Sequence, residues 1–225
     1  MPAARQSRRE DNGIALAQKG SIFLQIRTKS VLGVVFGLAW IAVIAGGFGV
    51  FLKYDTKPGP QGAAPQQWPH VTFARATNRP TLVMVAHPLC PCTRASIGEL
   101  AQIMGRVQGK VLAYVLFVKP TNSSAEWDAT NLQRSAAKIP GVTVRSDPGG
   151  ADASKFGAET SGQTLLFAAD GHLLFSGGIT ESRGHAGDNA GEQAIISLAR
   201  NGAAGPKQSF VFGCMLADRN DRARP

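Results

Sequence analysis

The chain has 225 residues, of which 44% are hydrophobic, and this is enough for one globular domain with a buried core. The formal net charge is +9 at pH 7, but no long basic run interleaved with aromatic residues occurs in the part expected to fold. Composition and charge therefore argue against nucleic acid as a partner. Attraction to anionic lipid headgroups explains the basic N-terminal residues better.

An apolar stretch near the N-terminus predicts a membrane anchor. Residues 31–52 carry no charge over 22 positions, which suffices to cross a hydrocarbon core as a helix. The alternative is a cleaved signal peptide, whose apolar region is usually about 7–15 residues long. Bulky residues fill the end of this stretch, and they favour an uncleaved anchor. Residues 1–30 form a basic leader, so we expect the N-terminus in the cytoplasm and everything after residue 52 outside it.

The remainder divides into a linker, a domain and a tail. Residues 53–69 are rich in Pro, Gly and Gln and predict a flexible linker; residues 70–203 predict an α/β domain, and residues 204–225 a C-terminal tail. Expected strands are 70–75, 81–86, 111–118 and 142–146, with helices after 92, around 124–138 and near 151–157. Asp170-Gly171 predicts a hairpin between 164–169 and 172–176, and a last helix is expected at about 190–200.

Two thiols stand where the strand at 81–86 meets the helix that follows it. Cys90 and Cys92 are separated by Pro91, and a helix N-terminus favours thiolate over thiol. They are too close together to join distant parts of a fold. We therefore expect redox exchange, metal binding or a vestigial pair, with Cys90 as the more exposed nucleophile and Cys92 as its partner. Cys214 is a candidate second resolving thiol.

The order of elements around Leu89-Cys-Pro-Cys92 resembles that of thioredoxin-fold proteins, and in particular their membrane-tethered, periplasm-facing branch. The string from Leu174 to Gly191, with Phe212-Gly-Cys214, is similar to bacterial proteins labelled RedB. The resemblance implies a three-layer fold, a mixed central sheet flanked by helices, in a single-pass protein of the bacterial inner membrane. It implies a thiol-disulfide oxidoreductase without a cofactor, with periplasmic protein thiols or a redox protein as partners.

Two departures from the thioredoxin pattern modify this expectation. A Cys-x-Cys disulfide closes a small, strained ring, so its potential should differ from that of Cys-x-x-Cys. Gln163 occupies the position where thioredoxins place a cis-proline, which argues against ordinary exchange with protein substrates.

A metal-binding chaperone or assembly factor is the alternative function. Thiolates with an imidazole suit copper or zinc, and the candidate ligands are Cys90, Cys92, His87, His185 and Cys214. The glycine-rich loop from Arg183 to Gly191 could bind an anion through backbone N–H groups. Alternatively, Arg183 or His185 could be an accessory residue that lowers the pKa of a cysteine or relays a proton. A tethered interaction domain with a degenerate site is the third hypothesis.

Overall fold

The computed structural model describes residues 31–121, 123, 127, 130–202 and 206–216. The chain divides into two compact units, Met1–Tyr54 and Asp55–Pro225. A continuous helix, Val31–Asp55, is long and apolar enough to cross a membrane. The basic leader predicted over residues 1–30 and the end of the predicted tail lie outside the described residues.

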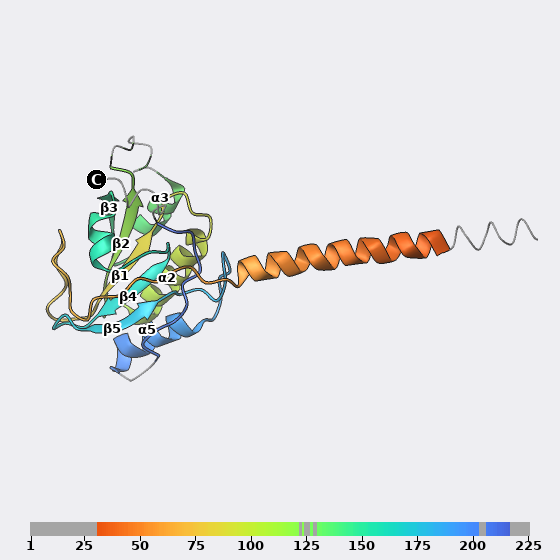
Figure 1. Ribbon diagram of the computed structural model, residues 1–225. Coiled ribbons are helices and arrows are strands. Elements are labelled where there is room, and N and C mark those ends of the chain that lie inside the picture. The colour runs from red at the N-terminus through yellow and green to blue at the C-terminus, as the bar shows by residue number, and fades with distance from the viewer. Residues whose placement is uncertain (1–30, 122, 124–126, 128–129, 203–205, 217–225) are drawn as a thin grey trace, which may run out of the picture. The chain divides into compact units, whose positions relative to one another are not determined.

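A five-stranded mixed sheet forms the centre of the second unit, in the order β3-β2-β1-β4-β5 (Figure 1). The strands are β1 (Thr81–Ala86), β2 (Leu112–Lys119), β3 (Val142–Pro148), β4 (Gln163–Phe167) and β5 (Leu173–Gly177). β1, β2 and β3 run parallel, whereas β4 is antiparallel to both β1 and β5. The helices are α2 (Thr93–Val107), α3 (Asn131–Ala137), α4 (Ala151–Lys155) and α5 (Ala190–Asn201).

The central strand β1 is buried on both faces, as its nearly continuous apolar sequence predicts. Leu82 and Met84 belong to a core that includes α2, α3 and α5, whereas Val83 and Val85 face a second core with α4. Because side chains alternate across a strand, one strand supplies both cores. The result is a three-layer α/β arrangement, and the thioredoxin-like fold class expected from the sequence is confirmed.

Local sequence signals place most elements correctly. The hairpin at Asp170-Gly171 forms between β4 and β5. Asn189 caps α5, its side-chain oxygen accepting a hydrogen bond from the backbone N–H of Glu192. The strand predicted at 70–75 is wrong: no ladder forms there, and Phe73 instead packs against Trp68 and Tyr114. Its apolar residues are used for packing against the outer core rather than for strand pairing.

The flexible linker expected over 53–69 also needs correction. Backbone hydrogen bonds join Gly59 to Val211 and Trp68 to Gly171, and the hydroxyl of Thr160 donates to the carbonyl of Pro60. The Trp68 ring also contacts Phe73, Phe156 and Phe167. Composition alone could not reveal this, because the partners come from the far end of the sequence.

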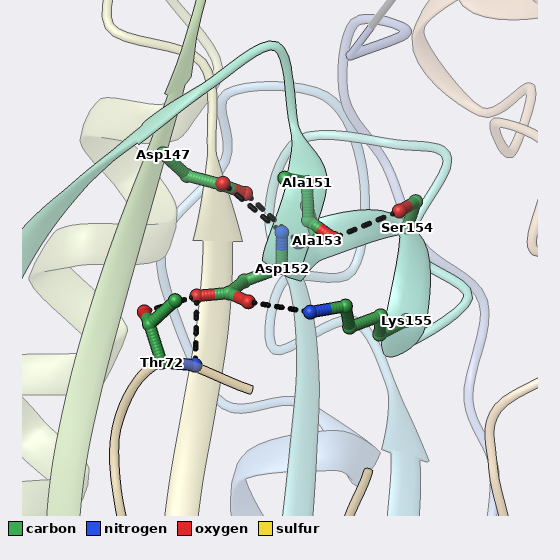
Figure 2. Close-up of polar contacts among 7 residues, drawn as sticks. All are labelled: Thr72, Asp147, Ala151, Asp152, Ala153, Ser154 and Lys155. Atoms are coloured by element: carbon green, nitrogen blue, oxygen red, sulfur yellow. Dashed lines mark hydrogen bonds and ion pairs between the residues drawn. The ribbon is translucent and has the colours of Figure 1, made fainter. Parts of the chain in front are cut away.

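Asp147 does more than begin a turn. Its carboxylate accepts hydrogen bonds from the backbone N–H groups of Asp152 and Ala153 at the start of α4, at 3.0 and 2.8 Å (Figure 2). Asp152 in turn accepts from the hydroxyl of Thr72 and pairs with Lys155. Through Asp152 and Asp147, the segment around Thr72 is therefore hydrogen-bonded to α4, and α4 to β3.

Candidate functional site

A tight turn carries the first two cysteines from β1 into α2. The backbone N–H of Cys90 donates to the carbonyl of His87 at 3.2 Å, and the N–H of Leu89 donates to the Nδ1 atom of His87 at the same distance. Cys92 is the N-cap residue of α2, and its side chain makes no capping hydrogen bond. The thiols therefore stand at the start of α2, as the sequence predicts.

The third cysteine joins the first two. The Sγ atoms of Cys90, Cys92 and Cys214 all lie within 4.8 Å of one another, and all three thiols are free. Cys90 and Cys214 are the close pair, with 2.7 Å between their Sγ atoms. The sequence made Cys214 a candidate accessory thiol, and the structure places it directly beside Cys90.

The expected exposure of the two turn cysteines is reversed. Cys90 is only 2% exposed, whereas Cys92 and Cys214 are partly exposed. From the sequence, Cys90 was expected to be the more accessible thiol. The turn instead directs Cys90 inward, against the segment that carries Cys214.

The C-terminal segment, residues 206–216, reaches the site by pairing with the loop before β4. The carbonyl of Cys214 accepts from the N–H of Ser161 at 2.8 Å, and the N–H of Leu216 donates to the carbonyl of Glu159 at 2.9 Å. Gly213 lies so close that an added Cβ atom would be 2.0 Å from the carbonyl oxygen of Ser161. Only glycine allows this approach.

Ser161 connects the three parts of the site and was not predicted from the sequence. Its Oγ atom accepts from the backbone N–H of His87 at 2.8 Å and shares a 2.6 Å hydrogen bond with the hydroxyl of Thr93. Its own N–H donates to Cys214. Nothing in the sequence near Ser161 indicates this role. Thr93 could have been found, because it directly follows Cys92.

The three thiols have different acidities. Burial raises the pKa of Cys90, but hydrogen bonds from Cys214 and Thr93 outweigh burial and hold this pKa below its ordinary value. Burial, the hydrogen bond with Cys90 and the charge of Cys90 raise the pKa of Cys214 to about 12. Of the close pair, Cys90 is therefore the more acidic thiol and loses its proton first, and Cys214 is the thiol that keeps its proton to higher pH.

Cys92 does not gain the acidity expected at a helix N-terminus. Burial raises its pKa, and the nearby negative charge of Cys90 raises it further. The positive charge of Arg183 opposes this effect at both Cys92 and Cys214. Burial and the negative charge of Cys90 outweigh the positive charge of Arg183 and the hydrogen bond with Cys214, both of which lower the pKa of Cys92.

The predicted accessory residues Arg183 and His185 differ in their positions. The Arg183 guanidinium donates to the carbonyl of Gly213, next to Cys214, so it lies at the site. The Nδ1 atom of His185 instead lies near the hydroxyl of Ser182 and 3.4 Å from a carboxylate oxygen of Asp55. In this glycine-rich loop the backbone N–H of Gly187 donates to a carboxyl oxygen of Glu99 at 2.8 Å, so this N–H already has a partner within the protein.

The five-residue metal site expected from the sequence is reduced to three thiols. Within the described residues, the cluster of metal-ligating side chains contains the cysteines but neither His87 nor His185. His87 serves the turn, and its ring packs edge-on against Trp127. Burial lowers the pKa of His87, which favours the neutral ring that accepts from Leu89. Gln163, at the expected cis-proline position, is buried in β4 opposite Val85.

Comparison with known proteins supports the fold and does not identify a family. No family model matches the chain, and no curated protein matches it. A crystal structure of an uncharacterized conserved protein from Geobacillus kaustophilus aligns with a TM-score of 0.52 at 16% identity, over 73% of this chain and 93% of that chain. A hypothetical protein from Sinorhizobium meliloti aligns with a TM-score of 0.50 at 15% identity, over 72% and 96%.

A weaker match is a secreted Mycobacterium tuberculosis disulfide oxidoreductase homologous to E. coli DsbE. Its TM-score is 0.34 at 16% identity, over 43% of this chain and 66% of that chain. All these identities are below 25%, so the likeness concerns the fold alone. What the chain does must be argued from its three thiols.

Proposed function

We propose that this protein carries out thiol-disulfide exchange with Cys90 and Cys214 as its redox couple. The observation that carries the proposal is the 2.7 Å distance between their Sγ atoms, in a pair where the pKa of Cys90 is lowered and that of Cys214 is raised. The spacing of the turn cysteines had favoured Cys92 as the partner of Cys90. The contact with Cys214 makes the distant thiol the better partner.

The pKa differences suggest an order of events. Cys90, ionised most readily, attacks the disulfide of a partner and forms a mixed disulfide. Its negative charge then disappears, and with it two of the causes that raise the pKa of Cys214. Cys214 therefore becomes easier to ionise when it is needed to resolve the mixed disulfide. The positive charge of Arg183 favours the same step.

Cys92 is the third thiol in this scheme. It is more exposed than Cys90, and its Sγ atom lies within 4.8 Å of both other sulfurs. Cys92 can therefore attack a Cys90–Cys214 disulfide, and the new disulfide that includes Cys92 would be more exposed. Its raised pKa makes it a poorer first nucleophile at neutral pH.

Thiol trapping across a glutathione redox series tests the couple. The reduced protein and the Cys90→Ser, Cys92→Ser and Cys214→Ser variants are equilibrated, alkylated and mapped by mass spectrometry. We expect a Cys90–Cys214 cross-linked peptide in the wild type and in Cys92→Ser, and no such peptide in the other two. A dominant Cys90–Cys92 peptide, or thiols that never change state, would contradict the proposal.

We propose that helix Val31–Asp55 anchors the domain at the bacterial inner membrane, with the thiols on the periplasmic side. Its length and apolar composition support this, together with the basic residues that precede it in the sequence. A membrane-impermeant maleimide added to intact spheroplasts should label Cys92 of the reduced protein. Labelling that requires lysis would place the domain in the cytoplasm instead.

A Cu(I) site is the second candidate function, because three thiolates within 4.8 Å match the soft ligands that Cu(I) prefers. A structural zinc site usually takes four ligands, and neither histidine supplies the fourth. The 2.7 Å pair favours redox chemistry, since two sulfurs bound tetrahedrally to one zinc at about 2.3 Å would lie roughly 3.8 Å apart.

Metal analysis of the anaerobically purified protein distinguishes the two functions. Stoichiometric copper that is lost in each of the three Cys→Ser variants would favour the copper site. Copper that survives Cys214→Ser, or that never binds against a competing chelator, would remove it.

A further inference from the structure

A cavity of about 350 Å³ lies beside the cysteine turn and reaches Cys90. Pro88, Leu89, Pro91 and Arg94 line it from the turn and the start of α2, and residues 130–132 line it from the start of α3. Neither Cys92 nor Cys214 is among its described lining residues. Cys90 is therefore part of the wall of this cavity, and its Sγ atom contacts that of Cys214.

The size of the cavity restricts what can reach Cys90. Only 2% of Cys90 is exposed, so a cysteine held on the broad surface of a folded protein cannot approach its sulfur closely. A cavity of this volume falls within the range of small-molecule sites. A low-molecular-weight disulfide, with its sulfur atoms on a slender chain, fits this access.

Charge restricts the ligand further. Arg94 is exposed and is the charged residue among the described cavity-lining residues. No ion pair of Arg94 is found within the described part of the chain, so its guanidinium is available to a ligand carboxylate. A planar guanidinium binds a carboxylate with two hydrogen bonds. Thr130 and Asn131 add polar groups on the opposite wall.

Resting on the proposed function, we propose that the cavity beside Cys90 binds small disulfides that carry a carboxylate, with Arg94 as the residue that selects their charge. The Cys90 thiolate attacks one ligand sulfur, a Cys90–ligand disulfide forms, and the ligand disulfide breaks to release the first thiolate. Cys214 then attacks Cys90, the Cys90–Cys214 bond forms, and the second ligand thiolate leaves. Two protein thiols are oxidised, one ligand disulfide is reduced, and both thiol protons pass to the two released thiols.

The test compares two small disulfides with the same spacer and opposite charge, 3,3′-dithiodipropionate and cystamine. Oxidation of the reduced full-length protein is followed by acid quench and mass spectrometry at low salt. Each rate is divided by the rate of 2-mercaptoethanol with the same reagent, because this thiol has no charged group besides its reacting sulfur and therefore corrects for the intrinsic reactivity of each disulfide. We expect the normalised rate to be about fivefold higher for the dicarboxylate, as for an ionic contact worth about 1 kcal/mol.

Three variants make the assignment specific. Arg94→Gln should bring the ratio of the two rates close to one. Arg79→Gln is the matched control, because Arg79 bonds to Gly109 away from the cavity, and its ratio should stay at the wild-type value. Asn131→Trp should fill the cavity and slow both reagents at least fivefold, without changing the equilibrium constant measured against dithiothreitol.

The possible failures can be told apart. If the Cys90–Cys214 disulfide forms equally fast with both reagents, or if Arg94→Gln leaves the preference intact, charge selection by Arg94 is overturned. If Asn131→Trp slows neither reagent, access through the cavity is overturned. If neither reagent nor oxidised dithiothreitol ever produces the Cys90–Cys214 disulfide, the proposed function itself fails.

Discussion

The cysteine turn and the C-terminal segment supply the same site by different physical means. The turn at residues 87–92 is held by short-range contacts, such as those of His87 with Leu89 and Cys90. The segment at 206–216 is held by residues far away in the sequence, including Glu159 and Ser161. Local contacts position two thiols close together, but a long-range contact supplies the partner that adjusts the acidity of Cys90.

Gly213→Ala should have the largest effect, because it should disturb the C-terminal segment and leave the cysteine turn intact. The added Cβ atom would lie 2.0 Å from the backbone oxygen of Ser161, so the segment must move and take Cys214 with it. We expect the rate of Cys90–Cys214 disulfide formation to fall more than tenfold, because effective concentration depends steeply on geometry. The turn should keep its structure, and Cys90 should still react with small alkylating agents.

Gly105→Ala is the matched control for this change. Gly105 lies within α2, and an added Cβ atom would meet nothing within 4 Å. The variant should be more stable by about 0.5–1 kcal/mol, as expected for alanine in a helix interior. Equal disulfide formation in both variants would show that the tight approach of Gly213 is unimportant.

Ser161→Ala should weaken the connection between the regions. The part-buried N–H of His87 and the buried hydroxyl of Thr93 would both lose their hydrogen bond to Ser161, which costs about 1–3 kcal/mol in the free energy of unfolding. Urea denaturation followed by circular dichroism measures this loss. Ser154→Ala removes an exposed hydroxyl bonded to Ala151 and should change stability by less than about 0.5 kcal/mol. Similar losses in the two variants would argue against the connecting role of Ser161.

The sequence predicts one region well and the other poorly, for a physical reason. The apolar run before Cys90 and the helical periodicity after it are local patterns, and the structure has β1 and α2 at those positions. Cys214 lies 124 residues after Cys90, and it is held beside Cys90 by isolated backbone contacts of its segment with Glu159 and Ser161. No periodic pattern encodes such contacts, so the sequence could only make Cys214 a candidate.

The same difference between local patterns and long-range contacts explains the two main errors in the sequence-based predictions. Residues 53–69 have the composition of a linker, but they are held by contacts with distant residues such as Val211 and Gly171. The expected exposure of Cys90 was wrong because the direction of a side chain within a turn depends on what packs against it. No local sequence pattern indicates the role of Ser161, because this role depends on contacts among three segments of the chain.

Replacing Cys214 tests how the C-terminal segment affects the turn. Cys214→Ala removes one hydrogen bond to the Cys90 thiolate, so the pKa of Cys90 should rise and its pH profile of alkylation should move to higher pH. Only the thiolate reacts, so alkylation at neutral pH should slow about tenfold for the loss of a hydrogen bond to a charged group. The measurement uses a Cys92→Ser background. An unchanged profile would mean that the Cys214 side chain does not contribute to the acidity of Cys90.

Arg183→Gln should have the smallest effect, because it leaves the close pair of sulfurs intact. The positive charge of Arg183 lowers the pKa of both Cys92 and Cys214, so its removal should raise both values and leave the attack by Cys90 nearly unchanged. The resolving step should therefore slow a few-fold at neutral pH, and a Cys90 mixed disulfide should accumulate. Arg183→Lys keeps the charge and should restore much of the rate, which separates an electrostatic effect from a packing effect. Rapid acid quench with mass spectrometry resolves the two steps, and slowing confined to the first step would assign Arg183 to Cys90 instead.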